Sequence, residues 1–217
     1  MTDRPLDRRP FLRGAGALAA LAVLPRLPAQ AAAPLVATPR QTAGPFYPTR
    51  FPDDVDNDLA VIAGRSQVAA GQIAHVGGRV LDVTGRPISG AVVEIWQCDV
   101  NGRYHHVDSA WQTQPADDNF QGYGRTVTAD DGFYRFRTIR PVAYSGRTPH
   151  IHFAVAGAGI ERFITQMYLA GEPLNERDPV LSHIRDPRAR QSVMVALEPA
   201  DGQEPGALGA RFNIVLG

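Results

Sequence analysis

The sequence predicts an all-β protein: an antiparallel β-sandwich core with long loops and little helix. From Gln72 onward, short segments alternate apolar and polar residues with a period of two, which is typical of half-buried strands. Turn sequences such as Thr84-Gly-Arg-Pro87 and Asp130-Asp-Gly132 separate these segments. Many short strands without a longer internal repeat favour a sandwich or a barrel.

The pattern also places the individual elements. Only Asp178–Ile184 favours a short helix. The expected strands are Ile73–Val83, Ala91–Cys98, Gly124–Thr128, Phe133–Ile139, His150–Ala156, Phe163–Leu169, Ser192–Leu197 and Arg211–Leu216.

The chain divides by composition into a signal, an arm and a domain. In residues 1–31, Arg8 and Arg9 precede an apolar run and a stretch of small residues, which is typical of a twin-arginine export signal. The apolar run is about half as long as a membrane-spanning helix, so we expect no stable membrane anchor. Residues 32–71 form an N-terminal arm and residues 72–217 the β-sandwich domain. We therefore expect export to the periplasm, with the ordinary secretory route as the alternative.

Composition excludes several kinds of partner and site. The 217 residues carry 22 basic side chains, all of them arginine, and 22 acidic ones. This balance argues against nucleic acid or an anionic membrane as a partner. Cys98 is the only cysteine, so neither an intrachain disulfide nor a cysteine-based metal site can form. A metal ion would need histidine, tyrosine or carboxylate ligands.

The segment Arg140–Phe153 carries the candidate site. Alternation along a strand puts His150 and His152 on one face, with their side-chain roots roughly 6–7 Å apart, so that both rings can reach one metal ion. Tyr144 precedes them across a Ser-Gly turn, and Arg147 brings a permanent positive charge to the same edge.

A long polar segment between Cys98 and Gly124 completes the set of candidates. It is rich in aromatic and imidazole side chains, so we expect it to fold over the site. Its members are Tyr104, His105, His106, Trp111 and Tyr123. We expect His75, His105, His106 and His183 to lie at the surface or behind the site.

The candidate metal ligands are Tyr104, Tyr144, His150 and His152. A phenol loses its proton near pH 10 in water, so it binds a metal at neutral pH only where a strongly Lewis-acidic ion lowers its pKa. Ferric iron fits this donor set, whereas zinc more often binds three histidines, or histidines with a carboxylate.

Several long segments resemble the intradiol ring-cleavage dioxygenases. The resemblance spans Gln41 to about Tyr168 and is closest to the iron-bearing (beta) subunit of protocatechuate 3,4-dioxygenase. The segments are GRVLDVTGRPISGAVVEIWQCDVNGRYHH, DDNFQGYGRTVTADDGFYRFRTIRPVAY, GRTPHIHFAVAG and FITQMY.

The resemblance implies specific roles for these residues. One non-haem ferric ion per chain would be held in a β-sandwich core by Tyr104, Tyr144, His150 and His152. Arg147 and Gln166 would assist catalysis. Tyr144 would leave the metal and accept a substrate proton, and Tyr47 would border the substrate pocket.

The activity that the resemblance implies is oxidative ring cleavage. Both atoms of dioxygen would be inserted into a catechol-type diol between the hydroxyl-bearing carbons, giving a cis,cis-muconate-type dicarboxylate. The chain lacks the helical N-terminal region of catechol dioxygenases, which favours the protocatechuate-like branch. Which catechol is cleaved, and whether the chain forms a homo-oligomer or needs a partner subunit, stay open at this point.

Two other functions compete with this interpretation. Transthyretin-like and carbohydrate-binding sandwich modules, which are not enzymes, share patterns such as GRVLDVTGRPISGAVVEI. A jelly-roll metalloenzyme could combine His150 and His152 with a distant carboxylate or histidine. The shared run alone does not separate the modules from the enzyme. The pair Tyr104 and Tyr144 argues against the jelly-roll site, which has no use for two phenols.

Overall fold

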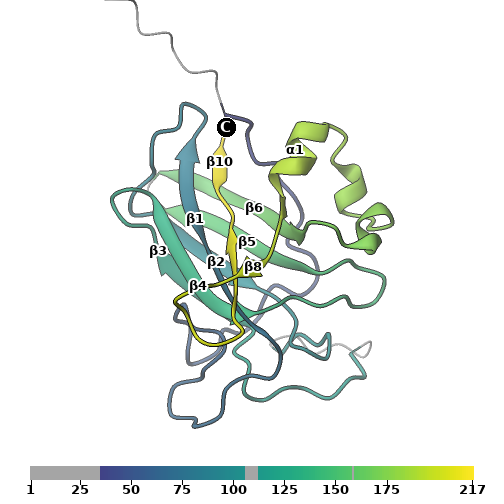
Figure 1. The fold of residues 1–217 in the computed structure, drawn as a ribbon. Coiled ribbons are helices and arrows are strands. Elements are labelled where there is room, and N and C mark those ends of the chain that lie inside the picture. Colours follow the sequence, from purple (N-terminus) through teal and green to yellow (C-terminus); the bar gives the residue numbers. More distant parts are fainter. Residues whose placement is uncertain (1–34, 106–111, 158) are drawn as a thin grey trace, which may run out of the picture. The chain divides into compact units, whose positions relative to one another are not determined.

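The computed structural model describes residues 35–105, 112–157 and 159–217. The predicted export signal, His106 and Trp111 lie outside this part of the chain. Two packed sheets form the fold (Figure 1). The first contains β1 (Ile73–Asp82), β4 (Phe133–Ile139), β8 (Glu198–Pro199), β9 (Leu208–Arg211) and β10 (Ile214–Leu216). The second contains β2 (Val92–Trp96), β3 (Tyr123–Val127), β5 (His150–Gly157), β6 (Ile160–Leu169) and β7 (Met194–Val195).

The predicted all-β sandwich is confirmed. The central pairs β3–β2, β2–β5 and β5–β6 are antiparallel, as expected. Three further pairs, β1–β9, β1–β10 and β6–β7, are parallel, so both sheets are mixed. In each parallel pair one strand comes from the C-terminal part of the chain and lies beside a strand that comes earlier in the sequence.

The C-terminal part differs most from the predicted elements. The predicted strand Ser192–Leu197 is reduced to β7, because the α-helix α1 (Pro187–Ser192) occupies the residues before it. Asp186 caps this helix by accepting the N–H groups of Arg188 and Ala189, and Pro187 fits the first turn. Within the predicted short helix Asp178–Ile184, only η2 (Leu181–His183) is helical, and it is a 3-10 helix. A second 3-10 helix, η1 (Pro173–Glu176), precedes it.

Only Ile214–Leu216 of the predicted strand Arg211–Leu216 forms a separate strand, β10, and Arg211 is the last residue of the preceding strand β9. The break lies where the carbonyl of Phe212 approaches Gly78 on β1 so closely that a Cβ atom there would be 1.8 Å from its oxygen. At this break the side chain of Asn213 bonds to β1, because its Oδ1 accepts the backbone N–H of Arg79 at 2.9 Å. Both strands therefore stay on the same edge of β1.

The main core fills the space between the two sheets. Alternate residues of the second sheet, including Ile95, Ile151 and Phe153, meet Val76, Phe136 and other residues of the first sheet and are fully buried there. The remaining residues of β2, β5 and β6 face away from this core. This outer face of the second sheet also carries apolar side chains, so another segment of the chain must bury it.

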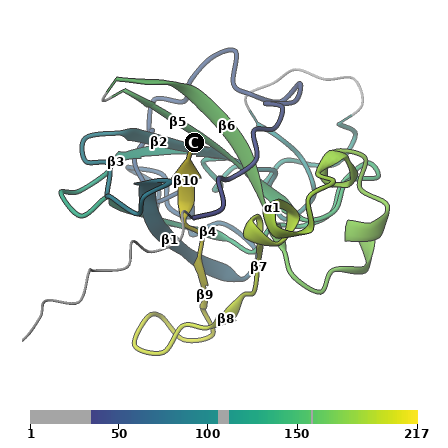
Figure 2. The ribbon, with the colours of Figure 1, turned by 90° about the horizontal axis from the view of Figure 1, so that it is seen from above.

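The N-terminal arm supplies this cover. Its backbone bonds to both sheets, with Thr38 donating to Val215 and Gln41 donating to Ile164. Seen from above, the purple arm passes along the outer side of β6 (Figure 2). Phe46 of the arm, together with Trp96 and Tyr104, belongs to a second apolar cluster outside the main core. Within the described residues, no helix is long and apolar enough to cross a membrane.

Candidate active site

Strand β5 carries two histidines on the covered outer face. Ile151 and Phe153 enter the main core, while His150 and His152 face outward and are only 1% exposed. The prediction that both imidazoles share a face is therefore confirmed. His152 pairs across the sheet with Trp96 on β2 and Gln166 on β6, so these neighbours lie on the same face.

The two imidazoles point at a common position. Their Nε2 atoms are 3.2 Å apart. Two ligands at right angles around a metal ion, each at about 2.1 Å, would lie about 3.0 Å from each other. Nδ1–H of His150 donates to the Thr148 carbonyl at 2.6 Å, which leaves the Nε2 lone pair for a ligand.

Both histidines are neutral at physiological pH. Burial, reinforced by the positive charge of Arg147, lowers the pKa of His150 to about 4. Burial also lowers the pKa of His152 well below its usual value, with His150 and Arg147 adding to the effect. Neutral imidazoles are the form that binds a metal ion.

Tyr104 lies in a loop that the buried carboxylate of Asp99 organises. Asp99 Oδ1 accepts the N–H groups of Asn101 and Arg103, while Oδ2 contacts His105 Nε2 at 2.8 Å. These contacts close a tight turn directly before Tyr104. The ring of Phe46 then stacks on Tyr104, with centroids 4.6 Å apart.

A second turn places Tyr144 beside Arg147. The carbonyl of Tyr144 accepts the N–H of Arg147 at 2.7 Å, and the two central residues, Ser145 and Gly146, both have positive φ. This is the pattern of a type I′ turn. It brings the ring of Tyr144 to 5.3 Å from Tyr104 and 5.5 Å from His150, between centroids.

All four predicted ligands thus converge. In the described part of the chain, the Tyr104 hydroxyl and the His152 Nδ1 are buried without a hydrogen-bond partner. Burial raises the pKa of both Tyr104 and Tyr144, so neither phenol would ionise unaided at neutral pH. The described residues contain no group of three His, Cys, Asp or Glu side chains that could hold a metal. Two neutral imidazoles and two phenols therefore fit a strongly Lewis-acidic ion better than zinc.

Arg147 and Gln166 are in direct contact. Nη2 of Arg147 donates to Oε1 of Gln166 at 2.7 Å, and Nε2 of Gln166 donates to the Thr42 carbonyl in the arm at 3.0 Å. Gln166 Oε1 also accepts the hydroxyl of Tyr168 at 3.0 Å. Both ends of the Gln166 amide are thereby engaged, and its carbonyl oxygen faces the guanidinium.

A pocket of about 530 Å³ opens beside the site. The arm, the Tyr104 loop and the Tyr144 turn form its walls. Its charged lining residues are Arg103 and Arg147, and no carboxylate lies among the described lining residues. The pocket is large enough for a small aromatic molecule, and Arg103 brings a positive charge to its wall that can attract an anion.

Comparisons with known proteins agree with this arrangement. The sequence model of the family described as Dioxygenase matches residues 42–217. The chain is 37% identical to the protocatechuate 3,4-dioxygenase beta chain of Burkholderia cepacia over 88% of its own length and 84% of that protein's. The dioxygenase domain of a dioxygenase and carbohydrate-binding protein fusion from Streptomyces sp. SirexAA-E superposes with a TM-score of 0.64 at 28% identity, covering 83% of this chain and 98% of that one.

The chain belongs to the intradiol dioxygenase family.

This dioxygenase spans only part of its catechol-cleaving relatives. It is 30% identical to a catechol 1,2-dioxygenase from Pseudomonas sp., over 82% of its own length but only 62% of that protein's. The chain therefore spans about three fifths of the length of that relative.

The position of the site in this dioxygenase differs from the expected one. The resemblance implied a metal held in the sandwich core, but the four donors lie on the outer face of one sheet, opposite that core. The core side of β5 carries apolar residues such as Ile151 and Phe153. The site is instead enclosed by the arm and by loops.

The other tyrosine and histidine residues that the sequence analysis discussed are not among the four proposed metal ligands. Tyr47 packs edge-on against Trp96 and donates to Glu94 at 3.1 Å, and it is not among the lining residues of the pocket. His75 pairs with Glu204. His105 pairs with Asp99, as described above, and His183 is exposed.

Sequence reasoning missed three contributors. Trp96 stacks on His152 with ring centroids 4.8 Å apart, and Phe46 stacks on Tyr104. Asp178 is fully buried beside Arg147. An Asp-Pro pair at residues 178–179 signals the start of a helical turn, but nothing in the local sequence indicates its contact with Arg147.

We predict that Gly102→Ala disrupts the site. Gly102 has a φ of +78°, and an added Cβ would lie 3.1 Å from Cβ of Tyr144, so the variant should push the two tyrosines apart. Gly171→Ala is the matched control, since Gly171 has a φ of +80° with nothing within 4 Å. Backbone strain of about 1 kcal/mol should be common to both variants. Only Gly102→Ala should lose metal and activity; equal loss in both variants would contradict the assigned contact.

Proposed function

We propose that this chain is a ferric-iron-dependent intradiol dioxygenase that cleaves a catechol-type diol. The observation that carries the proposal is the convergence of Tyr104, Tyr144, His150 and His152 beside a pocket that also exposes Arg147. Bound ferric iron would act as a Lewis acid, lowering the pKa of the phenols and of a chelated diol and activating the ring towards dioxygen. Membership of the family supports this assignment.

Charge balance makes the donor set suitable for a diol. Tyr104, Tyr144, His150 and His152 would hold the ferric ion, with the negative charge supplied by the two tyrosines and the histidines neutral. A doubly deprotonated diol would then leave no uncompensated charge in the buried site if one of the tyrosines regains its proton. Tyr144 is the half-buried phenol at the pocket wall, and we assign its Oη as the acceptor of a substrate hydroxyl proton.

Arg147 is assigned an electrostatic role in the same reaction. Its guanidinium stays positively charged throughout and lines the pocket, so it can stabilise negative charge that develops on the ring carbon attacked by dioxygen. Gln166 holds one side of that guanidinium. In the overall reaction one carbon–carbon bond of the diol breaks, and both atoms of dioxygen enter the dicarboxylate product.

The pocket favours a diol that bears a negative charge. Arg147 is already paired with the carboxylate of Asp178, whereas Arg103 lines the pocket beside no carboxylate of the described lining, so a ring carboxylate would gain from Arg103. Nη1 of Arg103 already donates to the carbonyls of Gln112 and Gln114, so this cation is held at the pocket wall. We therefore propose a carboxylated catechol, such as the protocatechuate for which the Burkholderia cepacia relative is named.

All four proposed ligands come from this one chain. A partner subunit or further copies of the chain would therefore act on the pocket walls or on stability, and the donor set would not depend on them.

The function is tested by metal analysis together with product analysis. Aerobically purified protein should hold about one ferric ion per chain and show a broad visible tyrosinate-to-iron absorption. A panel of diols should give muconate-type dicarboxylates containing both atoms of labelled dioxygen, with protocatechuate converted more efficiently than catechol. Zinc in the active enzyme, or a yellow semialdehyde from cleavage beside the diol, would overturn the assignment.

Arg147→Ala should separate catalysis from metal binding. Loss of one such cation in the transition state costs roughly 3–4 kcal/mol, or about 10²–10³-fold in turnover. The variant should retain iron and colour and should still change its spectrum when a catechol is added under anaerobic conditions. Thermal unfolding serves as the folding control, because Asp178 loses its ion-pair partner. Turnover within about threefold of the parent would remove Arg147 from the catalytic residues.

Export through the twin-arginine route is proposed on the sequence alone. A protein that folds around its metal suits a route that carries folded cargo. Replacing both Arg8 and Arg9 by lysine should leave the protein in the cytoplasm, as measured by cell fractionation. Undiminished export of this variant would instead identify the ordinary secretory route.

A further inference from the structure

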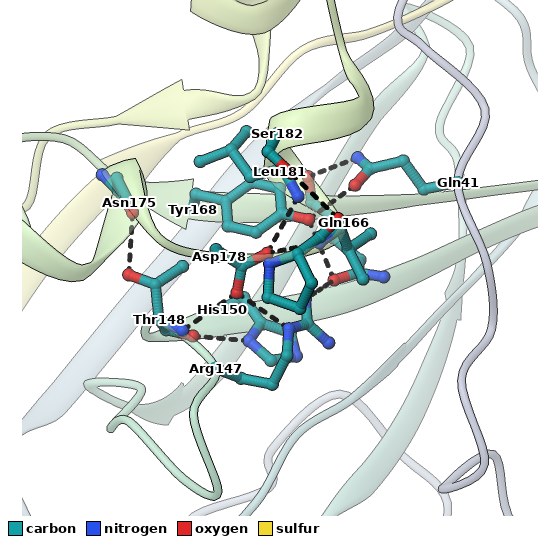
Figure 3. Close-up of polar contacts among 12 residues, drawn as sticks. Gln41, Arg147, Thr148, His150, Gln166, Tyr168, Asn175, Asp178, Leu181 and Ser182 are labelled. Atoms are coloured by element: carbon teal, nitrogen blue, oxygen red, sulfur yellow. Dashed lines mark hydrogen bonds and ion pairs between the residues drawn. The ribbon is translucent and has the colours of Figure 1, made fainter.

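Asp178 is a buried carboxylate that the reaction scheme does not use. It lies in the connection between η1 and η2 and is 0% exposed. Oδ2 accepts Nε–H of Arg147 at 2.8 Å and the backbone N–H of Thr148 at 3.0 Å. Oδ1 accepts the N–H groups of Val180 and Leu181 at 3.0 and 2.8 Å (Figure 3). The carboxylate therefore joins the η2 segment to the segment that leads into β5.

These contacts hold the guanidinium of Arg147 on two sides. Asp178 binds Nε and Gln166 binds Nη2, from two different segments (Figure 3). Within the described residues, Nη1 donates no hydrogen bond, and Arg147 lines the pocket. A planar guanidinium held at two of its three nitrogens has a defined orientation, and its remaining edge is available to a bound molecule.

The same carboxylate also steadies the peptide before His150. Thr148 donates its N–H to Asp178, and its carbonyl accepts Nδ1–H of His150. Pro149 restricts Thr148 to extended backbone, which limits the direction of that carbonyl. Thr148 Oγ1 bonds to Asn175 Oδ1 at 2.7 Å, which is a further tie to the segment containing η1.

Asp178 and Arg147 form a buried ion pair in which hydrogen bonds favour the charged carboxylate. Burial alone would raise the pKa of Asp178, but hydrogen bonds from Arg147 and from the N–H groups of Leu181 and Thr148 outweigh it and lower that pKa. A buried ion pair is often no more stabilising than apolar residues of the same size, so stability alone does not explain why one is placed here. Directing a charged side chain into the pocket does explain it.

We propose that Asp178 is a positioning residue for Arg147, fixing the direction in which its guanidinium faces the substrate pocket. The inference rests on the proposed dioxygenase function. Asp178 lies behind Arg147 and touches it on the side of Nε, and the proposed effect on turnover is exerted through this contact. The competing explanation is that Asp178 merely caps η2 through Val180 and Leu181.

Asp178→Asn tests the proposal with little change in size. The amide oxygen can keep the contacts to Val180 and Leu181, whereas the NH₂ group would face two donors, Nε–H of Arg147 and N–H of Thr148. We expect kcat to fall by roughly 10- to 100-fold, since misplacement by about 1 Å can cost that much. The KM should change less than about threefold, because Arg147 acts in the transition state. Iron content should be unchanged.

A double-mutant cycle separates positioning from a general structural role. If Asp178 acts through Arg147, then Asp178→Asn should change kcat by less than about twofold in the Arg147→Ala background. A similar fall in both backgrounds would overturn the proposal. Asp186→Asn is the matched control: Asp186 also caps a helix with its side chain but lies outside the site, so kcat should stay at the parent value.

Thermal unfolding of the same four proteins gives a readout that does not depend on turnover. Asp178→Asn should lower Tm by more than about 5 °C when Arg147 is present, but not in Arg147→Ala, where the buried charge is already unpaired. If no diol is cleaved by the parent, the proposed function fails while this coupling is still measured. If the coupling is absent, the positioning role fails by itself.

A second substitution covers the case in which Asp178→Asn does not fold. Asp178→Ser retains an oxygen that can cap η2 but is too short to reach the guanidinium, so it should show the same loss of kcat. If neither variant folds while Arg147→Ala does, then Asp178 has a folding role independent of Arg147, and the proposal is overturned.

Discussion

Strand β5 is buried on both faces, and the rest of the structure depends on this. One face, with Ile151 and Phe153, fills the space between the sheets, and such burial contributes roughly 1.5–3 kcal/mol per large side chain. The other face holds two imidazoles, for which burial is costly unless they stay neutral and find partners. An exposed outer face would leave them solvated and unable to act together. The arm and the loops cover this face, bury the two imidazoles and form the walls of the pocket beside them.

The cover is built from aromatic contacts and backbone bonds. Phe46 stacks on Tyr104, and Trp96 stacks on His152, so each flat ring limits the movement of a proposed ligand. The arm is held in turn by backbone bonds to both sheets, through Thr38 and Gln41. Excluding water from this region strengthens every electrostatic interaction in it, including those of the Arg147 cation.

Three different local structures orient the four proposed ligands. The sheet aligns the two histidines, the type I′ turn presents Tyr144, and the carboxylate of Asp99 shapes the loop of Tyr104. Buried carboxylates organise two of the loops: Asp99 before Tyr104, and Asp178 behind Arg147. Both accept several backbone N–H groups, which is the main way in which a carboxylate can be buried at moderate cost.

The sequence by itself determined the sandwich class, most of the strands of the N-terminal two thirds of the domain and the shared face of the two histidines. Period-two alternation decides which residues of β5 share a face, and His-x-His needs no tertiary information to be read. The Ser145-Gly146 turn likewise acts over a few residues, so the proximity of Tyr144 and Arg147 was visible in the chain.

Only the tertiary structure decided the rest. The outer-face position of the site, the stacking of Phe46 and Trp96, and the contact of Asp178 with Arg147 join segments far apart in sequence, and local propensity carries no signal for such contacts. The C-terminal elements were also decided by packing. The two strands beside β1 are separated because the carbonyl of Phe212 packs against Gly78, which local periodicity does not reveal. Local pattern acts over a few residues, whereas burial and hydrogen bonding are settled by whichever segments meet in the folded chain.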